Sequence, residues 1–97
     1  MARVRWSRPA TIDLAELGKF LARDSPPAAR RAAQVILAGV RQLRQFPASG
    51  KPADDASEGT RDLIVPFGNG GYVIRYMLQG DEVTINAIRH TKQAGFR

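Results

Sequence analysis

The sequence contains no cysteine among its 97 residues and only one histidine, His90. The absence of cysteine excludes a disulfide framework and every thiolate metal site, including a zinc finger. His90 has no second histidine and no nearby carboxylate cluster with which to share a metal ion. We therefore expect neither a metal ion nor any other cofactor.

Long apolar runs are also missing. No stretch approaches 18 consecutive apolar residues, and residues 1–6 carry charge at alternate positions instead of the apolar core of a signal peptide. We expect a cytoplasmic protein without a membrane anchor. With 43% hydrophobic and 25% charged residues, the chain is expected to fold as one small domain over residues 1–97.

Basic residues outnumber acidic ones. Fifteen lysines and arginines against nine acids give a net charge of +6 and favour anionic partners, namely nucleic acid or an acidic protein. Twelve of the fifteen are arginines, whose planar guanidinium suits phosphate and carboxylate recognition better than lysine does. The alternative interpretation is ordinary solubilising charge.

Two helices are predicted in the first half of the chain. Ser7 can cap a helix that runs from about Pro9 to Arg23, and Ser25 can cap a second one that ends before Phe46. Each predicted helix has an apolar stripe at helical spacing. The stripe of the first helix is Ala10, Leu14, Leu17 and Leu21, and that of the second is Ala29, Ala32, Ile36, Val40 and Leu43. The short connection between them predicts a helical hairpin.

Strand-forming residues occupy the rest of the sequence. Residues 3–7 alternate between charged and apolar, and three further strands are predicted over residues 61–65, 72–78 and 82–90, after a polar and mobile loop at 48–59. Tight connections imply an antiparallel meander. The predicted fold class is α+β with the order β-α-α-β-β-β, in which the helical hairpin packs on one face of a small, mainly antiparallel sheet. The other face is left open.

Each of the three strands of the predicted meander carries one arginine, namely Arg61, Arg75 and Arg89 in chain order. In the middle strand Tyr72, Ile74, Tyr76 and Leu78 share one face, so Arg75 points to the other. A buried arginine without a partner is costly. Arg75 is therefore expected either to pair with an acid such as Asp62 or Glu82, or to face solvent and a ligand.

His90 lies beside Arg89 and close to Lys92. Adjacent cations disfavour the charged imidazolium, so the ring should be neutral and able to act as a base near neutral pH. A surface histidine, or one that simply makes a hydrogen bond, is the alternative. We take Arg75, Arg89, His90 and Lys92 as the candidate binding residues. No phosphate-binding loop or nucleophilic serine motif is present.

Seven stretches, in their order and spacing, carry a resemblance to a known family. They are residues 4–7 (VRWS), 28–31 (AARR), 43–47 (LRQFP), 50–52 (GKP), 59–63 (GTRDL), 72–76 (YVIRY) and 83–90 (VTINAIRH) with Gln93. In these stretches the chain resembles toxins of the RelE/ParE superfamily from bacterial type II toxin–antitoxin systems. The resemblance implies a toxin neutralised by a co-expressed antitoxin, whose C-terminal segment folds onto it.

Two activities are implied by the resemblance. RelE-type toxins are ribosome-dependent mRNA endoribonucleases, and in that case Arg61 and Arg89 would stabilise the phosphate while His90 acts as base or acid. ParE-type toxins are not enzymes and inhibit DNA gyrase. In that case the C-terminal residues 89–97 and the first hairpin are the candidate contacts with gyrase.

The sequence departs from the RNase pattern at several positions. An arginine that related RNases place at the start of the middle hairpin strand aligns with Gly71 or Tyr72, and no tyrosine follows His90. The loop that should supply further lysines offers only Lys51. We therefore predict a ParE-like toxin whose partners are a ParD-like antitoxin and DNA gyrase, with the RelE-like RNase as the alternative.

Overall fold

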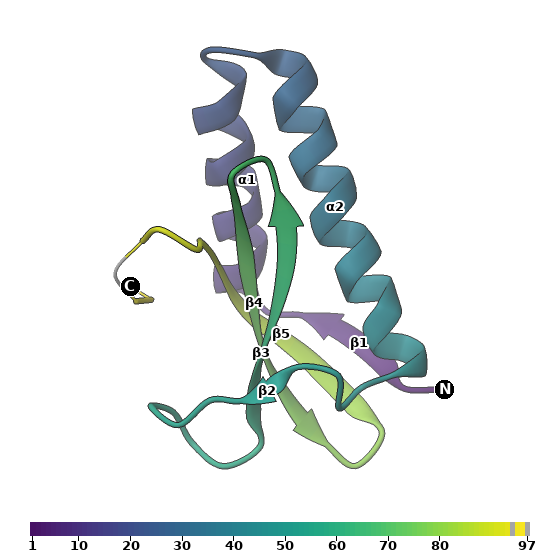
Figure 1. Ribbon diagram of the computed structural model, residues 1–97. Coiled ribbons are helices and arrows are strands. Elements are labelled where there is room, and N and C mark those ends of the chain that lie inside the picture. Colours follow the sequence, from purple (N-terminus) through teal and green to yellow (C-terminus); the bar gives the residue numbers. More distant parts are fainter. Residues whose placement is uncertain (94, 97) are drawn as a thin grey trace.

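The computed structural model describes residues 1–93 and 95–96, and within these it has two helices and five strands (Figure 1). Their bounds are β1 (Arg3–Trp6), α1 (Arg8–Ala22), α2 (Pro26–Gln45), β2 (Lys51–Pro52), β3 (Thr60–Phe67), β4 (Gly70–Gln79) and β5 (Glu82–His90). The predicted α+β fold class is confirmed.

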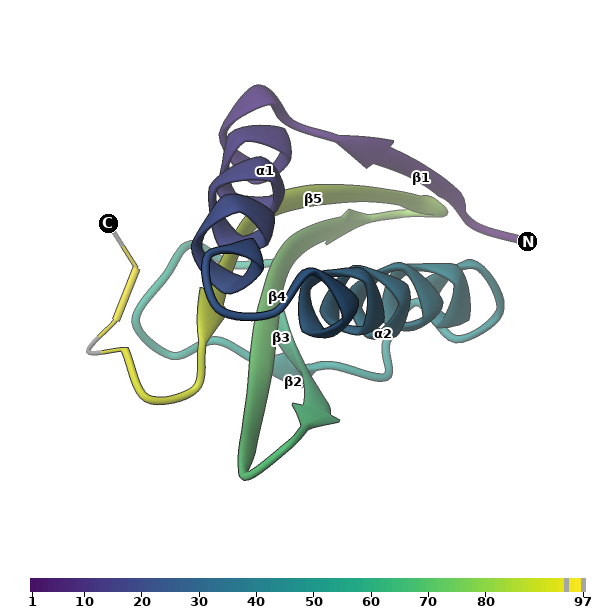
Figure 2. The same ribbon diagram turned by 90° about the horizontal axis from the view of Figure 1, so that it is seen from above.

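The two helices begin at the serines that the sequence indicates. Ser7 Oγ accepts a hydrogen bond of 3.2 Å from the backbone N–H of Ala10, and Ser25 Oγ accepts one of 3.2 Å from Ala28. Each serine thus satisfies one of the free N–H groups at its helix start, and a proline follows each cap in the first turn. The helices form the predicted hairpin and lie against the sheet (Figure 2).

The five strands form one sheet in the order β1-β5-β4-β3-β2. Strands β3, β4 and β5 make the expected antiparallel meander, while β1 pairs with β5 in parallel. The strand β2 was not predicted, because residues 48–59 show no alternation and Pro52 is a poor strand former. In the structure Lys51 and Pro52 pair with Asp62 and Arg61.

The core lies between the helices and one face of the sheet. As predicted, Tyr72, Ile74 and Tyr76 point towards the helices and are buried, and they pack with Ile36 and Leu43 of α2. The Tyr76 hydroxyl accepts from the Gly50 N–H at 2.9 Å and donates to the Pro47 carbonyl at 2.7 Å. This buried tyrosine therefore fixes the start of the segment that the sequence suggests to be mobile.

In the described part of the chain, no helix has the length and apolar character needed to cross a bilayer.

Candidate functional site

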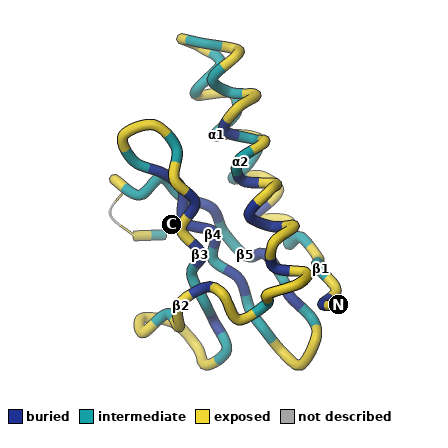
Figure 3. The backbone as a smooth tube through the Cα atoms, turned by 45° about the vertical axis from the view of Figure 1, so that its right-hand side comes forward, coloured by how far each residue is buried: buried dark blue, intermediate teal, exposed yellow. Residues whose placement is uncertain are grey.

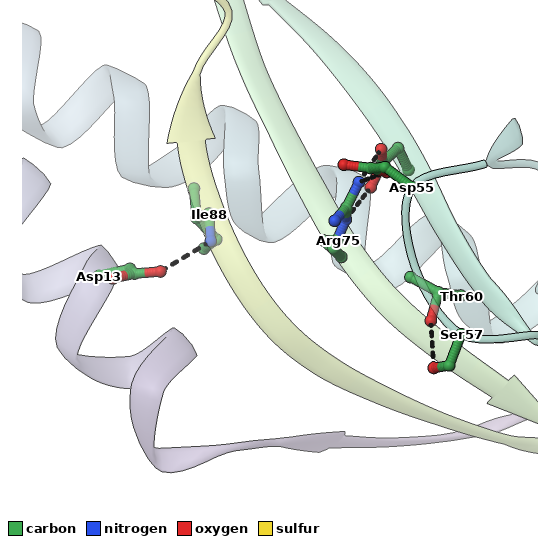
Figure 4. A network of polar contacts seen from close by, with 7 residues as sticks. Asp13, Asp55, Ser57, Thr60, Arg75 and Ile88 are labelled. Atoms are coloured by element: carbon green, nitrogen blue, oxygen red, sulfur yellow. Dashed lines mark hydrogen bonds and ion pairs between the residues drawn. The ribbon is translucent and has the colours of Figure 1, made fainter. Parts of the chain in front are cut away.

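The face of the sheet turned away from the helices carries a cluster around Arg75. Its Nε donates to Asp62 Oδ1 at 2.9 Å, and its Nη2 donates to Asp62 Oδ2 at 2.9 Å and to Asp55 Oδ1 at 2.8 Å (Figure 4). Asp62 stands opposite Arg75 in the register of β3 and β4. The expectation that Arg75 pairs with an acid is thus confirmed for Asp62, whereas Glu82 pairs with Arg3 and Arg5.

Phe96 and Arg89 complete this group, which we call the Arg75 cluster (Arg75, Asp55, Asp62, Arg89 and Phe96). The Cζ atoms of Arg75 and Arg89 lie 4.2 and 4.9 Å from the centre of the Phe96 ring, within the range of cation–π attraction. Arg89 Nη1 also donates to the carbonyls of His90 and Gln93, at 3.2 and 3.0 Å. Arg89 therefore holds the turn that brings Phe96 onto the sheet.

The Arg75 cluster shifts the ionisation of its members. Hydrogen bonds to Asp62 and Asp55 raise the pKa of Arg75 above its already high ordinary value. The hydrogen bond from Arg75 lowers the pKa of the Asp55 carboxyl below its ordinary value of 3.8. Both shifts favour the charged forms, so Arg75 and Asp55 remain an ion pair at neutral pH.

The Asp55 shift predicts how stability depends on pH. Because the pKa of Asp55 is depressed in the folded state, its contribution is present above pH 3.8 and is lost as the pH falls through the folded value. Asp55→Asn is therefore expected to be less stable than the wild type at pH 7, with the difference shrinking below about pH 4. Urea denaturation from pH 7 to pH 2.5 measures this, with Asp54→Asn as the control. A difference that stays constant over this range would contradict the prediction.

His90 and Arg89 point to opposite faces of β5. The His90 ring lies edge-on to Tyr72, with ring centres 5.4 Å apart, and Tyr72 belongs to the core on the helix side. His90 Nδ1 accepts from the backbone N–H of Lys92 at 3.0 Å. Since neighbouring residues of a strand alternate between faces, Arg89 joins Arg75 while His90 faces α1.

Arg61 lies in a third environment. Its Nη1 donates to the Ala48 carbonyl at 3.1 Å and to the Gly50 carbonyl at 2.6 Å. Arg61 pairs with Tyr76, whereas His90 pairs with Tyr72, which lies four residues earlier in β4, or about 13 Å away at strand spacing. The structure thus joins Arg75 with Arg89 but does not bring Arg61, Arg89 and His90 together. Lys92 lies exposed beyond the end of β5.

The positions that align with the RNase arginine are closed to a long charged side chain. A Cβ atom added to Gly71 would collide with the Val65 carbonyl oxygen and lie 3.1 Å from Pro66 Cα. Tyr72 is 1% exposed and faces the core. Neither Gly71 nor Tyr72 can therefore present an arginine to a ligand without rearrangement of the β3–β4 hairpin.

A groove between α1 and the end of β5 was not found from the sequence. It consists of two neighbouring hollows of about 410 and 420 Å³ that share Asp13, Glu16, Ile88 and Gln93. We call it the α1 groove. Asp13 Oδ2 accepts from the Ile88 N–H at 3.0 Å and so ties the helix to β5 (Figure 4).

The first hollow of the α1 groove is mainly apolar. Its apolar lining comes from Leu17, Phe20, Leu21, Tyr72 and Ile88. Phe20 is 64% exposed and adds the largest exposed apolar side chain to this hollow. The available signal in the sequence was Phe20 itself, which lies beside the predicted apolar stripe of the first helix and not on it.

Among residues 1–93 and 95–96 no group of three or more histidine, aspartate or glutamate side chains is placed to hold a metal ion.

Comparison with known proteins gives consistent matches over nearly the whole chain. The family model described as ParE toxin of type II toxin–antitoxin system, parDE, matches residues 4–95. Toxin RelE3 of Caulobacter vibrioides is 37% identical over 91 residues, which cover 94% of this chain and 96% of that protein.

Two solved structures share the fold. A chromosomal ParDE toxin–antitoxin system from P. aeruginosa matches with a TM-score of 0.74 and 24% identity, over 95% of this chain and 98% of that one. The toxin–antitoxin complex RelBE2 from Mycobacterium tuberculosis matches with a TM-score of 0.63 and 24% identity, over 92% of this chain and 96% of that one.

Proposed function

The chain belongs to the ParE toxin family of type II toxin–antitoxin systems, within the RelE/ParE superfamily, and from this premise we propose that it inhibits DNA gyrase. In this proposal the toxin acts in the cytoplasm, stops growth, and is neutralised by a cognate ParD-like antitoxin. Arg89, His90 and Lys92, at and just beyond the end of β5, are the proposed contacts with gyrase. The rest of the proposed C-terminal contact includes residues 94 and 97, which lie outside the described residues.

The separation of Arg61, Arg89 and His90 is the observation that carries this proposal. RNA cleavage needs a base for the 2′-hydroxyl and cations for the developing phosphate charge at one place. Here Arg61 binds two loop carbonyls, Arg89 belongs to the Arg75 cluster, and His90 packs against Tyr72. The residues considered for RNase chemistry thus lie at separate places and do not converge on one phosphate, which favours a toxin that acts by binding.

A gyrase assay tests the proposal. Purified toxin added to gyrase, ATP and plasmid DNA is expected to accumulate cleaved DNA and to reduce supercoiling, and prior addition of antitoxin is expected to prevent both. A cell-free translation reaction serves as the control and should continue at its normal rate. The absence of cleaved DNA together with unchanged supercoiling would contradict gyrase inhibition.

A RelE-like endoribonuclease is the second candidate, because the 37% identical relative from Caulobacter is named RelE3. In that case mRNA would be cut on the ribosome, with Arg61 and Arg89 at the phosphate and His90 as base or acid. The double variant Arg89→Ala, His90→Ala would then lose all cleavage of ribosome-bound mRNA. Under gyrase inhibition neither protein cleaves mRNA, so this measurement separates the two functions.

The α1 groove is the proposed site for an apolar anchor of the antitoxin. Its exposed Phe20 and the adjoining Leu17 and Leu21 offer apolar area, and Asp13 and Glu16 lie along the groove. An amphipathic segment that folds on binding would bury this apolar area.

Phe20→Ala is expected to weaken antitoxin binding about 30-fold, the effect of a typical aromatic hot spot. The matched control is Ile64→Ala, because Ile64 is 58% exposed but lies on the opposite face of the sheet. Isothermal titration of each toxin variant with antitoxin measures the effect. Equal affinities for the Phe20 and Ile64 variants would exclude the α1 groove as the antitoxin site.

A further inference from the structure

The exposed face of α2 is strongly basic. This helix of 20 residues contains Arg30, Arg31, Arg41 and Arg44 and no acidic residue, and all four arginines are exposed. Exposed positions recur along the whole of α2 (Figure 3). Each acid of the chain lies on another segment. Residues 30–44 of the helix therefore present a positive surface about four turns long, with no acidic residue on the same helix.

Three of these arginines form a line, which we call the basic stripe (Arg30, Arg41 and Arg44). At 100° per residue their Cα positions fall within about 60° of one another, with Arg31 at the flank. The stripe lies opposite the buried residues of α2, which are Ala32, Ile36, Gly39, Val40 and Leu43. It extends over about 21 Å, at 1.5 Å per residue.

The stability of the fold does not account for the basic stripe. In the described part of the chain, the ion pairs of arginine are made by Arg3, Arg5 and Arg75, and the α2 arginines make none. The helix dipole favours Arg44 in the last turn but gives no advantage to Arg30 in the N-terminal half, where acids are preferred. Arg41 and Arg44, three residues apart, repel each other by a few tenths of a kcal/mol.

We propose that the basic stripe binds the phosphate backbone of duplex DNA. Its length of about 21 Å equals the axial rise of about six base pairs. Single-stranded nucleic acid is normally held by stacking on aromatic side chains, and α2 contains no aromatic residue. Arginines spaced along one face of a helix instead suit the regular phosphates of a duplex. The proposal goes beyond gyrase inhibition, because it requires neither gyrase nor antitoxin.

The test compares two triple variants of the full chain with equal loss of charge. The first carries Arg30→Gln, Arg41→Gln and Arg44→Gln on α2. The control carries Arg8→Gln, Lys19→Gln and Arg23→Gln, which remove three exposed charges at and beside α1. Binding to a fluorescent 20-base-pair duplex is measured by anisotropy between about 50 and 200 mM KCl, the range in which phosphate contacts change affinity strongly. Circular dichroism checks that both variants are folded.

The α2 variant is expected to bind the duplex at least tenfold more weakly than the wild type. A plot of log affinity against log salt concentration should also become less steep, by about 2.7 in slope, because three phosphate contacts are lost. The control should stay within about threefold of the wild type if charge position matters more than total charge. Equal losses in the two variants, or no loss in the α2 variant, would overturn the proposal. Tighter binding of a 20-nucleotide single-stranded RNA than of the duplex would overturn the assignment to DNA.

Discussion

Gly71→Arg is expected to lower the free energy of unfolding by about 3 kcal/mol and not to produce mRNA cleavage. This change places an arginine where the sequence pattern of related RNases would have one. In the structure, however, the new Cβ would collide with the Val65 carbonyl oxygen and lie 3.1 Å from Pro66 Cα. Backbone atoms cannot move aside as a flexible side chain can, so the β3–β4 hairpin must distort to admit the substitution.

Urea denaturation followed by circular dichroism measures this loss, and a ribosome-dependent cleavage assay tests for activity. Gly18→Ala is the matched control, because a Cβ atom at Gly18 in α1 would meet nothing within 4 Å beyond the adjoining residues and backbone of its own helix. Alanine favours a helix over glycine, so this variant should gain about 0.5–1 kcal/mol. If Gly71→Arg were as stable as the wild type, the hairpin would be more adaptable than its close packing indicates.

The result also bears on the difference between the two toxin types. Val65 pairs with Tyr72 in the β3–β4 register, and glycine at position 71 allows the two strands to approach closely. Tyr72 meanwhile fills the core and supports the His90 ring. The packing of the sheet therefore leaves no room for an arginine at the position where related RNases have one, and a single substitution is not expected to produce RNase activity.

Most of the fold could be predicted because it follows from periodicity and local capping. Ser7 and Ser25 lie directly before helical stripes, and the strands after residue 60 alternate and are separated by glycine-containing turns. The strand β2 could not be found in this way. Its two residues show no pattern, and it is held by contacts from β3 and Tyr76 that are distant in the sequence.

The candidate site was predictable only where strand alternation decides the matter. Alternation placed Arg75 on the open face, and the same rule applied to Arg89 and His90 places these two neighbours on opposite faces of their strand. By contrast, the contact of Asp55 with Arg75 comes from a loop, and the ring of Phe96 reaches the sheet through a turn. Such contacts depend on the conformation of loops and turns, and the spacing of residues in the sequence does not predict that conformation.

Asp62→Ala is expected to lower the free energy of unfolding by about 2 kcal/mol, because it leaves the part-buried Arg75 guanidinium without its main hydrogen-bond partner. The Arg75 side chain is only 15% exposed and directs two hydrogen bonds at Asp62. Without Asp62 the remaining carboxylate, Asp55, satisfies only one Nη2 contact. Thermal and urea unfolding of the variant measure the loss, and a change below about 0.5 kcal/mol would show that water or Asp55 replaces the missing carboxylate.

The double variant Asp62→Leu, Arg75→Met separates the structural role of Arg75 from a role in binding. Removing both charges leaves no buried ion unpaired, so its stability should return to within about 1 kcal/mol of the wild type. Because the hydrogen bonds of Arg75 are internal and its guanidinium lies over Phe96, we also expect unchanged gyrase inhibition. A stable double variant that no longer inhibits gyrase would instead show that Arg75, on the open face of the sheet and across the Phe96 ring from Arg89, contacts the target.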